Sequence, residues 1–512
     1  MKSMLDSKLC SAEDAAAIIE DGQTVACGGF VGISHPEALT SAIEERFLHN
    51  GSPRNLTLVY AAGQGDGKTR GLNHLAHKGL LKRVVGGHWG LAPGLGRLAS
   101  ENLIEAYNFP QGVICQLLRD IAAGRPGCIT HIGLDTFIDP KNGGGRLNSC
   151  SRESLVERIR LGEKEWLWYK SFPVHIGLIR GTAADPFSNI VTYDEAIIGE
   201  VLPIAQAVHN CGGRVIAQVK KLLKKPVPPQ SVKVPGILVD HIVVADPDKH
   251  HQTFAEKYNN GYFSPAPEGI SLKTTDPMEM GPRRIIAARA LKEIGEGAIA
   301  NLGIGIPEDI GRVAEEYGLL DKFILTLESG PIGGVPAGGW SFGASLYPQA
   351  IIDQPAQFDF YDGRGLDFAA LGAAEIDSYG NVNVSKFGDK VPGVGGFVNI
   401  TQTAKKLVFC STMTAGGLKI SCTKNNLVIE NEGSINKFVK DVEQVSFSAP
   451  HSLGIGQEVI YITERAVFRL NRNGLELIEA APGIDIESQI LGVMDFKPIV
   501  RDVKLMPKEI FR

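Results

Sequence analysis

Short apolar runs that end in glycine-rich turns recur along this chain and predict its first elements. Thr24 to Cys27 runs into Gly28-Gly29-Phe30, and Leu56 to Ala62 is followed by another glycine-rich turn. Helical periodicity is seen in Gln111 to Ala123, which Gly124 ends. The alternation of a short buried strand, a glycine loop and a helix is typical of a mostly parallel, doubly wound sheet. The first half of the chain is therefore predicted to be an α/β domain.

The same order of elements begins again in the second half. A predicted helix at Arg283 to Ile294 precedes a strand at Ala298 to Leu302 and the glycine loop Gly303-Ile304-Gly305-Ile306. Pro307-Glu308 then opens a helix, as Pro36-Glu37 does in the first half. Such a repeat indicates an internal duplication. We expect two similar open α/β/α domains with mostly parallel sheets and an active site between them.

Length and a loss of pattern place the domain boundary. The chain of 512 residues exceeds what one hydrophobic core usually supports, so two domains are expected. Phe254 to Pro282 holds several prolines, an Asn-Asn-Gly turn and few aliphatic residues, as linkers do. We predict an N-terminal α/β domain at residues 1–256, a linker at 257–282 and a C-terminal α/β domain at 283–512.

A single carboxylate in the predicted C-terminal domain stands at the end of a buried strand. The apolar run Phe323 to Leu327 leads directly into Glu328, and a glycine-rich loop follows from Gly330 to Gly339. Phe358 to Tyr361, further on, is predicted to be a short strand. In open α/β sheets, ligands bind at the carboxyl ends of strands, where this acid lies. The alternative is a solvated acid without a role, which is the commoner case for such a residue.

Direct attack is the chemistry that suits such a carboxylate. It is ionised at neutral pH and needs no general base. No partner acid follows Glu328 closely in the sequence. A nucleophilic carboxylate requires an electrophile, such as an activated acyl group, and backbone N–H donors for the oxyanion that develops. The loops around Gly303-Gly305 and Gly395-Gly396 are candidates for these donors.

Composition and charge narrow the class of protein. The net charge of −5 is spread along the chain, without a basic patch of the size that binds nucleic acid. Eight scattered cysteines form no CxxC pair and indicate reduced thiols, so a cytoplasmic location is expected. The sequence has no run of about 18 or more apolar residues that would cross a membrane, and the N-terminus lacks an apolar signal region.

Other familiar motifs are missing or incomplete. The glycine loops fit neither GxxxxGK[ST] nor GxGxxG, so they indicate an unspecific anion or cofactor phosphate, or tight turns alone. His35, His74, His77 and His88 have no carboxylate or cysteine at metal spacing. They are interpreted as structural or surface histidines, and no metal is expected. Ser329 and Ser341 have no nearby base of the nucleophile-elbow type.

Taken together and in order, the motifs resemble the class I CoA-transferases, and in particular the single-chain acetate/propionate CoA-transferase type. The resemblance covers nearly the whole chain. The motifs that carry it are Gly28-Gly29-Phe30, Gly86 to Pro93, Asn108 to Gly112, Asn301 to Pro307, Glu328-Ser329-Gly330, Gly333 to Gly339 and Val391 to Phe397. It implies an acyl-CoA:carboxylate CoA-transferase with the duplicated α/β fold expected above.

The resemblance also implies ping-pong chemistry through a glutamyl-CoA thioester. Glu328 stands at the position of the family's nucleophile. It would attack acyl-CoA to give an acyl–glutamyl anhydride and CoA thiolate, which then forms the glutamyl-CoA thioester and releases the first acid. A second carboxylate reverses these steps. Coenzyme A is a substrate, no permanently bound cofactor is implied, and a homodimer or homotetramer is expected.

Further residues take roles by their match to the family's motifs. Gly396 resembles the backbone oxyanion donor, Gln111 resembles a side chain beside the nucleophile, and Asn301 resembles a residue that contacts CoA near the thioester. The loops expected to bind CoA or substrate include Gly303, Gly305, Gly395, Gly333 and Gly334. The plainer readings are a loop glycine for Gly396, a cap for Gln111 and a helix-flanking amide for Asn301.

The chain departs from the family's pattern in ways that bear on specificity. Some members carry an asparagine oxyanion donor where Ala38 stands, so the oxyanion hole here would rely more on backbone N–H groups. Leu327-Glu328-Ser329-Gly330 differs from the Ser-Glu-Asn-Gly of the β-ketoacid branch, which favours acetate or propionate. Two alternatives remain: an acyl-CoA hydrolase that uses the same glutamate, and a nonenzymatic CoA-binding regulator.

Overall fold

The chain forms two compact units, which do not follow a single cut in the sequence. The computed structural model describes residues 5–268 and 277–511, and residues 269–276 of the predicted linker lie outside the described residues. Unit 1 comprises Met1–Pro267, Leu327–Asp359 and Phe387–Asn399. Unit 2 comprises Glu268–Thr326, Phe360–Lys386 and Ile400–Arg512. The predicted division at residues 257–282 stays a prediction.

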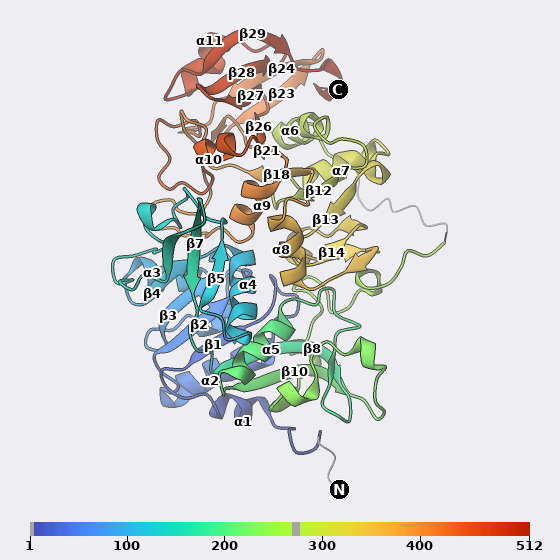
Figure 1. Cartoon of the computed structure of the whole chain (residues 1–512). Coiled ribbons are helices and arrows are strands. Elements are labelled where there is room, and N and C mark those ends of the chain that lie inside the picture. Colours follow the sequence, from blue (N-terminus) through green and yellow to red (C-terminus); the bar gives the residue numbers. More distant parts are fainter. Residues whose placement is uncertain (1–4, 269–276, 512) are drawn as a thin grey trace. The chain divides into compact units, whose positions relative to one another are not determined.

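A mostly parallel sheet forms the centre of unit 1 (Figure 1). Seven strands lie parallel in the order β11-β10-β8-β1-β2-β3-β4, and β9 pairs antiparallel with β8. The strands are β1 (Thr24–Cys27), β2 (Leu56–Tyr60), β3 (Leu81–Gly86), β4 (Glu105–Asn108), β8 (Ile176–Ala184), β9 (Ile190–Val191), β10 (Arg214–Leu222) and β11 (His241–Val244).

Helices and smaller sheets complete unit 1. Helix α5 packs on β8 and β10, and α4 packs against α5. The helices are α1 (Ala12–Ala17), α2 (Glu37–Asn50), α3 (Pro93–Ser100), α4 (Gln111–Ala122) and α5 (Val201–Asn210), while α8 (Gln354–Asp362) and α9 (Phe397–Thr403) begin in this unit. Antiparallel pairs join β5 (Gly127–Thr130) and β6 (Val156–Leu161) to β7 (Lys164–Lys170), β14 (Pro331–Ile332) to β17 (Ala350–Ile351), and β15 (Val335–Pro336) to β16 (Ser345–Leu346).

Unit 2 also contains a mostly parallel sheet. Its strands run in the order β13-β12-β18-β21-β26-β27-β28-β29, of which the first five are parallel. The antiparallel strands β27 and β28 follow, and β29 lies parallel to β28. The strands are β12 (Ile299–Leu302), β13 (Ile324–Thr326), β18 (Phe368–Gly372), β21 (Lys406–Cys410), β26 (Glu458–Ile462), β27 (Ala466–Asn471), β28 (Gly474–Ala480) and β29 (Ile499–Leu505).

The remaining elements of unit 2 are short. Its helices are α6 (Pro282–Leu291), α7 (Asp309–Glu316), α10 (Ala449–Gly454) and α11 (Ile486–Gln489). Small antiparallel pairs are β19 (Glu375–Ile376) with β20 (Val382–Asn383), β22 (Thr414–Ala415) with β25 (Ile435–Asn436), and β23 (Lys419–Thr423) with β24 (Asn426–Asn431). The 3-10 helices of the two units are η1 (Leu72–Leu75), η2 (Pro140–Asn142), η3 (Pro229–Ser231), η4 (Gly236–Leu238), η5 (Pro247–Lys249), η6 (Asn260–Tyr262), η7 (Leu320–Lys322), η8 (Gly339–Ser341), η9 (Leu491–Val493) and η10 (Lys508–Phe511).

Burial explains why apolar runs, rather than alternating patterns, form these strands. All nine residues of β8 are buried, and so are all four of β1. Strands of a parallel sheet are covered on both faces and therefore read as continuous apolar runs. The core of unit 1 packs the strands against Leu39 and Ile43 of α2, and the core of unit 2 packs Ala300 and Leu325 with Ile286 of α6. The predicted α/β class with mostly parallel sheets is confirmed.

The strand predicted at Phe358 to Tyr361 is wrong, because these residues belong to helix α8. Phe358 and Tyr361 are fully buried, whereas Phe360 between them is 39% exposed. That spacing of three is helical, and a short aromatic run does not reveal it. Asp353 caps the helix, since its Oδ1 accepts a hydrogen bond from the N–H of Ala356 at 2.8 Å.

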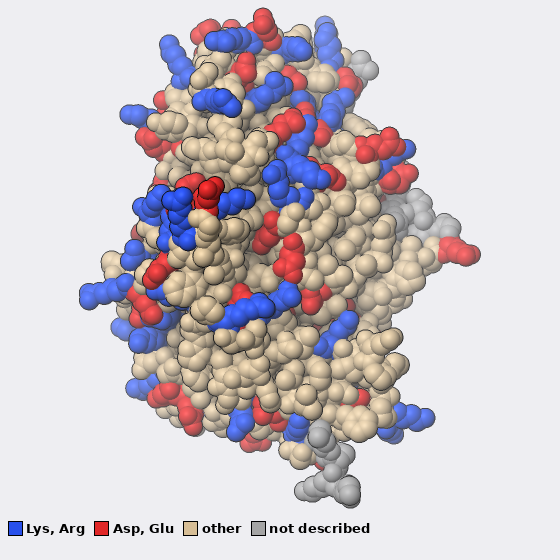
Figure 2. Space-filling view, viewed as in Figure 1, with Lys and Arg blue, Asp and Glu red and all other residues tan. Residues whose placement is uncertain are grey.

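Basic and acidic side chains are interspersed on the face of the molecule shown in Figure 2. This mixture agrees with a net charge of −5 that is spread along the chain. Within the described residues, no helix is long and apolar enough to cross a membrane.

Candidate active site

Glu328 lies on a tight turn of unit 1, just after β13. The N–H of Gly330 donates to the carbonyl oxygen of Leu327 at 3.0 Å, and the N–H of Leu327 donates to that of Pro331 at 3.0 Å. Gly330 has φ +123°, and a Cβ there would lie 2.1 Å from the oxygen of Ile352. This turn therefore needs glycine. Glu328 is half-buried while both of its neighbours in the chain are buried, so a rigid backbone presents its carboxylate.

Gly396 lies close to the side chain of Glu328. A Cβ at Gly396 would lie 3.6 Å from Cγ of Glu328 and 3.3 Å from Cζ of Phe358. Among the described residues, the N–H of Gly396 donates no hydrogen bond. The backbone therefore approaches Glu328 closely and carries a donor that a ligand can use.

Hydrogen bonds from the first half of unit 1 hold the loop that contains Gly396. The N–H of Gly395 donates to the oxygen of Gly87 at 2.8 Å, and the N–H of Gln111 donates to the oxygen of Gly395 at 2.9 Å. Oδ1 of Asn108 accepts from the N–H of Val394 at 3.1 Å. Residues 87–111 and 392–396, about 300 residues apart in the sequence, are thus hydrogen-bonded into one rigid cradle.

Gln111 places an amide beside this cradle. It begins helix α4 after Pro110, and its side chain is 2% exposed. Nε2 of Gln111 has no hydrogen-bond partner among the described residues, and Oε1 lies 3.5 Å from where a Cβ of Gly395 would be. A buried donor without an acceptor is costly, so it marks a position where a ligand oxygen fits.

His88 lies beside Gly395, as Gln111 does, although the sequence indicated only a structural or surface role for His88. A Cβ at Gly395 would be 3.6 Å from Cβ of His88. Burial lowers the pKa of His88 to about 4, so its imidazole is neutral at physiological pH. Its position directly after a strand and a Gly-Gly turn is the signal that could have identified it.

The position of the family's asparagine is closed to substrate. Ala38 is 3% exposed, and its N–H donates to Oε1 of Gln218 at 2.8 Å. The backbone of Ala38 therefore does not replace the missing side chain. Beside it, Glu37 is hydrogen-bonded by His74 at 3.0 Å, and His77 pairs with Glu44 at 2.6 Å.

These contacts with carboxylates account for the positions of His74 and His77. Burial alone would raise the pKa of Glu37, but the hydrogen bond and charge of His74, the charge of His35 and the N–H of Gly71 hold it at about 2. His74 and His77 contact carboxylates within the fold. Among the described residues, no group of three His, Cys, Asp or Glu side chains could hold a metal ion.

In unit 2, Asn301 is part of the sheet core. It lies on β12, is fully buried, and its Nδ2 donates to the oxygen of Thr326 at 3.1 Å. The N–H of Gly303 donates to Ala370 at 2.9 Å. Gly305 has φ +91° and nothing within 4 Å of a Cβ position, so this loop leaves open space above the strand end.

Gly333 and Gly334 are required by the backbone of unit 1. Their φ angles are +71° and +74°, in the turn between β14 and β15. A Cβ at Gly334 would lie 2.3 Å from the oxygen of Leu346. These contacts account for both glycines, and a contact of either with substrate stays a prediction.

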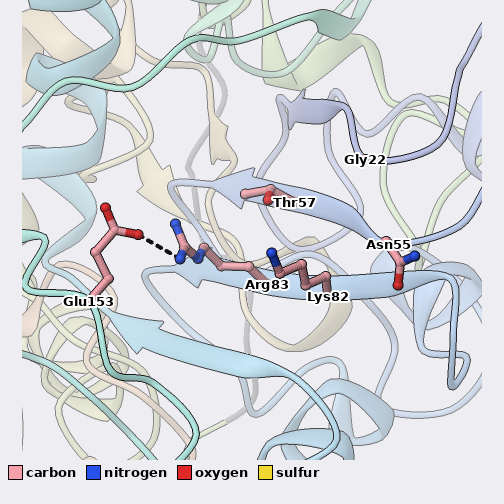
Figure 3. A pocket seen from close by; sticks show the side chains of 6 residues that line it. All are labelled: Gly22, Asn55, Thr57, Lys82, Arg83 and Glu153. Carbon is pink, nitrogen blue, oxygen red and sulfur yellow. Dashed lines mark ion pairs between the residues drawn. The ribbon is translucent and has the colours of Figure 1, made fainter.

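A hollow lies at the amino edge of the unit 1 sheet, opposite the edge that carries the glycine loops (Figure 3). Its volume is about 690 Å³, and its lining residues are Gly22, Asn55, Thr57, Lys82, Arg83 and Glu153. Gly22 and Asn55 precede β1 and β2, and Thr57, Lys82 and Arg83 lie in the first halves of β2 and β3, whereas the glycine loops follow the carboxyl ends of those strands. Glu153 lies between η2 and β6. Arg83 extends toward Glu153 and pairs with it at 2.6 Å.

Comparison with known proteins identifies the family. Residues 10–245 match the family model of coenzyme A transferases. The chain is 44% identical to the acetate CoA-transferase YdiF of Escherichia coli K12, over 98% of this chain and 94% of that protein. It is 41% identical to the caffeate CoA-transferase of Acetobacterium woodii, over 99% and 97% of the two chains.

The fold matches as well. The crystal structure of the E. coli O157:H7 acyl-CoA transferase YdiF, as a thioester complex with CoA, superimposes with a TM-score of 0.93 at 42% identity, covering 99% of this chain and 96% of that one. The predicted family is confirmed. This chain belongs to the coenzyme A transferase family and is a CoA-transferase.

Proposed function

We propose that this enzyme moves CoA between a short-chain acyl-CoA and a free carboxylate, of the acetate and propionate class, through a glutamyl-CoA thioester on Glu328. The approach of Gly396 to Cγ of Glu328, 3.6 Å from a Cβ position, is the observation that supports it most directly. The N–H of Gly396 has no acceptor among the described residues and is therefore available to an oxyanion that forms near the carboxylate.

The proposed reaction needs one nucleophile on the protein and no oxidant or reductant. The Glu328 carboxylate attacks the thioester carbonyl, the C–S bond breaks, and CoA thiolate leaves an acyl–glutamyl anhydride. The thiolate then attacks the glutamyl carbonyl, forms the glutamyl-CoA thioester and expels the first carboxylate. An incoming carboxylate attacks this thioester to give a new anhydride, and the thiolate takes up the new acyl group, which regenerates Glu328.

Each predicted site residue has a role in this proposal. The N–H of Gly396 stabilises the oxyanion on the glutamyl carbonyl, in the loop that Gly395 helps to anchor. Nε2 of Gln111 donates to a substrate oxygen. In unit 2, Asn301, Gly303 and Gly305 contact CoA, and Gly333 and Gly334 in unit 1 shape the acyl site.

Aromatic side chains beside the nucleophile support a small acid. Oγ of Ser329 donates to the oxygen of Gly343 at 2.6 Å, and a Cβ at Gly343 would lie 2.4 Å from the ring of Phe30. Phe30 in turn contacts Phe342, with ring centroids 5.8 Å apart. We infer a small acyl site from these buried rings, because they pack against the Gly343 backbone that Ser329, the neighbour of Glu328 in the chain, contacts.

The proposal extends to the enzyme's cofactor requirement, its location and its oligomeric state. An ionised carboxylate and CoA itself supply the chemistry, so no permanently bound cofactor is required. All eight cysteines are free thiols, which supports a cytoplasmic enzyme. We also propose a homodimer or homotetramer, on the resemblance to the family.

Trapping of the covalent intermediate tests the proposal. The full chain is incubated with acetyl-CoA, treated with borohydride, and digested for peptide mapping by mass spectrometry. We expect reduction of Glu328 in the wild type and none in Glu328→Ala, which should also lose transfer of CoA to propionate. An unmodified Glu328, together with full activity of Glu328→Ala, would overturn the proposal. Acetyl-CoA cleavage that proceeds equally without an added acid would identify a hydrolase instead.

A further inference from the structure

The imidazole of His88 occupies a slot that three glycines of unit 1 create. A Cβ at Gly63 would lie 2.6 Å from Nδ1 of His88, and one at Gly90 would lie 3.0 Å from Cε1. A Cβ at Gly395 would lie 3.9 Å from Cδ2, on the other edge of the ring. A side chain larger than hydrogen at Gly63 or Gly90 would displace the ring. The ring is therefore held in one place by backbone rather than by hydrogen bonds.

Hydrogen-bonding capacity on this ring is unused within the described fold. Nδ1 is buried and has no partner, whereas Nε2 keeps accessible surface. A buried N–H without an acceptor costs more than a buried lone pair, which favours the tautomer with the proton on Nε2. Since burial holds the pKa near 4, the ring presents one neutral N–H donor.

This donor has a counterpart in Gln111. Oε1 of Gln111 and Cβ of His88 lie 3.5 Å and 3.6 Å from the same Cβ position at Gly395, and Nε2 of Gln111 also lacks a partner. Both side chains thus flank the loop that ends at Gly396, beside Glu328. A carboxylate has two oxygens that only accept hydrogen bonds, so a pair of donors matches it. Neutral donors also leave more negative charge on the acid, which must act as a nucleophile, than a cation would.

We propose that His88 is a substrate-binding residue that donates a hydrogen bond from Nε2 to the free carboxylate substrate. This inference rests on the proposed CoA-transferase reaction and adds the residue that sets affinity for the acid. His88 is no general base here, because the acid is already ionised and needs no deprotonation.

Three variants of His88 separate this role from a structural one. His88→Phe keeps the ring volume without the donor, His88→Gln places an amide N–H near the position of Nε2, and His88→Asn places one near Nδ1. His49→Gln, at an exposed histidine at the end of α2, is the matched control. The KM for acetate, the KM for acetyl-CoA and the melting temperature are measured for each full-length protein.

We expect the KM for acetate to rise roughly 10- to 100-fold in His88→Phe and His88→Asn, as for a lost hydrogen bond to a charged group. His88→Gln should stay within about fivefold of the wild type, and the KM for acetyl-CoA within about threefold in all variants. An unchanged acetate KM in His88→Phe would overturn the inference. Equal rises in both KM values for all three variants, with lower melting temperatures, would show a structural role instead.

The outcome is separable from the proposed function. His88→Phe should still form the adduct at Glu328 from acetyl-CoA, because the nucleophile is intact. Absence of that adduct in the wild type would refute the reaction itself. An adduct in both proteins with the same acetate KM would refute only the role of His88.

Discussion

The two edges of the parallel sheet in unit 1 differ in how their polar groups are satisfied. At the amino edge, Arg83 binds Glu105 at 2.5 Å and Glu153 at 2.6 Å, in a hollow of about 690 Å³. At the carboxyl edge, Nδ1 of His88 and Nε2 of Gln111 are buried with no partner among the described residues. At the amino edge Arg83 is paired with both carboxylates, whereas at the carboxyl edge these two nitrogens have no partner in the described part of the chain.

This difference shows that volume alone does not identify a functional site. Glu105 and Glu153 need no ligand, because both already pair with Arg83. A buried donor without an acceptor, such as Nε2 of Gln111, raises the free energy of the empty site, and a bound substrate can recover that cost. The first three of the four predictions that follow test whether activity depends on the carboxyl edge alone, and the fourth concerns the pH dependence of stability.

Shortening the nucleophile should have the largest effect. Glu328→Asp retracts the carboxylate by about 1 Å, and we expect kcat for CoA transfer from propionyl-CoA to acetate to fall on the order of 100-fold or more. The same change at the amino edge, Glu153→Asp, should leave kcat within about twofold, since that side chain is 55% exposed. Steady-state kinetics of both variants compare the edges directly, and similar losses would contradict the comparison.

Crowding the oxyanion donor should come next. Gly396→Ala keeps the N–H but puts a Cβ 3.3 Å from Phe358 and 3.6 Å from Glu328. We expect kcat to fall roughly 10- to 50-fold, because a small displacement of the nucleophile is costly. Gly96→Ala in α3, with nothing within 4 Å of the new atom, is the control and should keep full activity. Equal kinetics of the two alanine variants would remove Gly396 from the site.

Breaking the amino-edge ion pairs should affect stability and not catalysis. Arg83→Met leaves Glu105 and Glu153 without their cation, and Arg83 is only 22% exposed. We expect a loss of about 1–3 kcal/mol in the free energy of unfolding, followed by urea denaturation. The ratio kcat/KM should not change. A fall in kcat/KM at unchanged stability would mean that the hollow in Figure 3 takes part in the reaction.

The smallest effect concerns a buried acid at the carboxyl edge. Oε1 of Glu200 lies 4.0 Å from a Cβ position at Gly28, and burial raises the pKa of Glu200 from 4.5 to about 8. Between these pH values the folded protein holds a proton that the unfolded chain releases. Stability contributed by this group is therefore present at low pH and lost as pH rises toward 8.

Glu200→Gln removes that dependence. Relative to the wild type, the variant should gain stability as pH rises from about 5 to 8.5, by a few degrees in melting temperature. Thermal denaturation at several pH values measures this. A difference between the two proteins that is constant with pH would contradict the raised pKa.

Local pattern was enough to predict several features of this protein. Apolar runs ending in glycine predicted a mostly parallel α/β fold, because strands covered on both faces must be apolar and strand ends must turn sharply. The helical identity of Phe358 was missed, since four aromatic and acidic residues fit either periodicity. The same ambiguity concealed its contact with the Gly396 position.

The sequence by itself determined the α/β class, the family, and a carboxylate at a strand end. Tertiary structure alone decided that residues 87–111 and 392–396 form one cradle beside Glu328, because that depends on hydrogen bonds between distant backbone groups. It also decided that Ala38 is closed by Gln218 and that His88 is neutral and available. Burial and unsatisfied hydrogen bonds are properties of a packed environment, which no local run of residues contains.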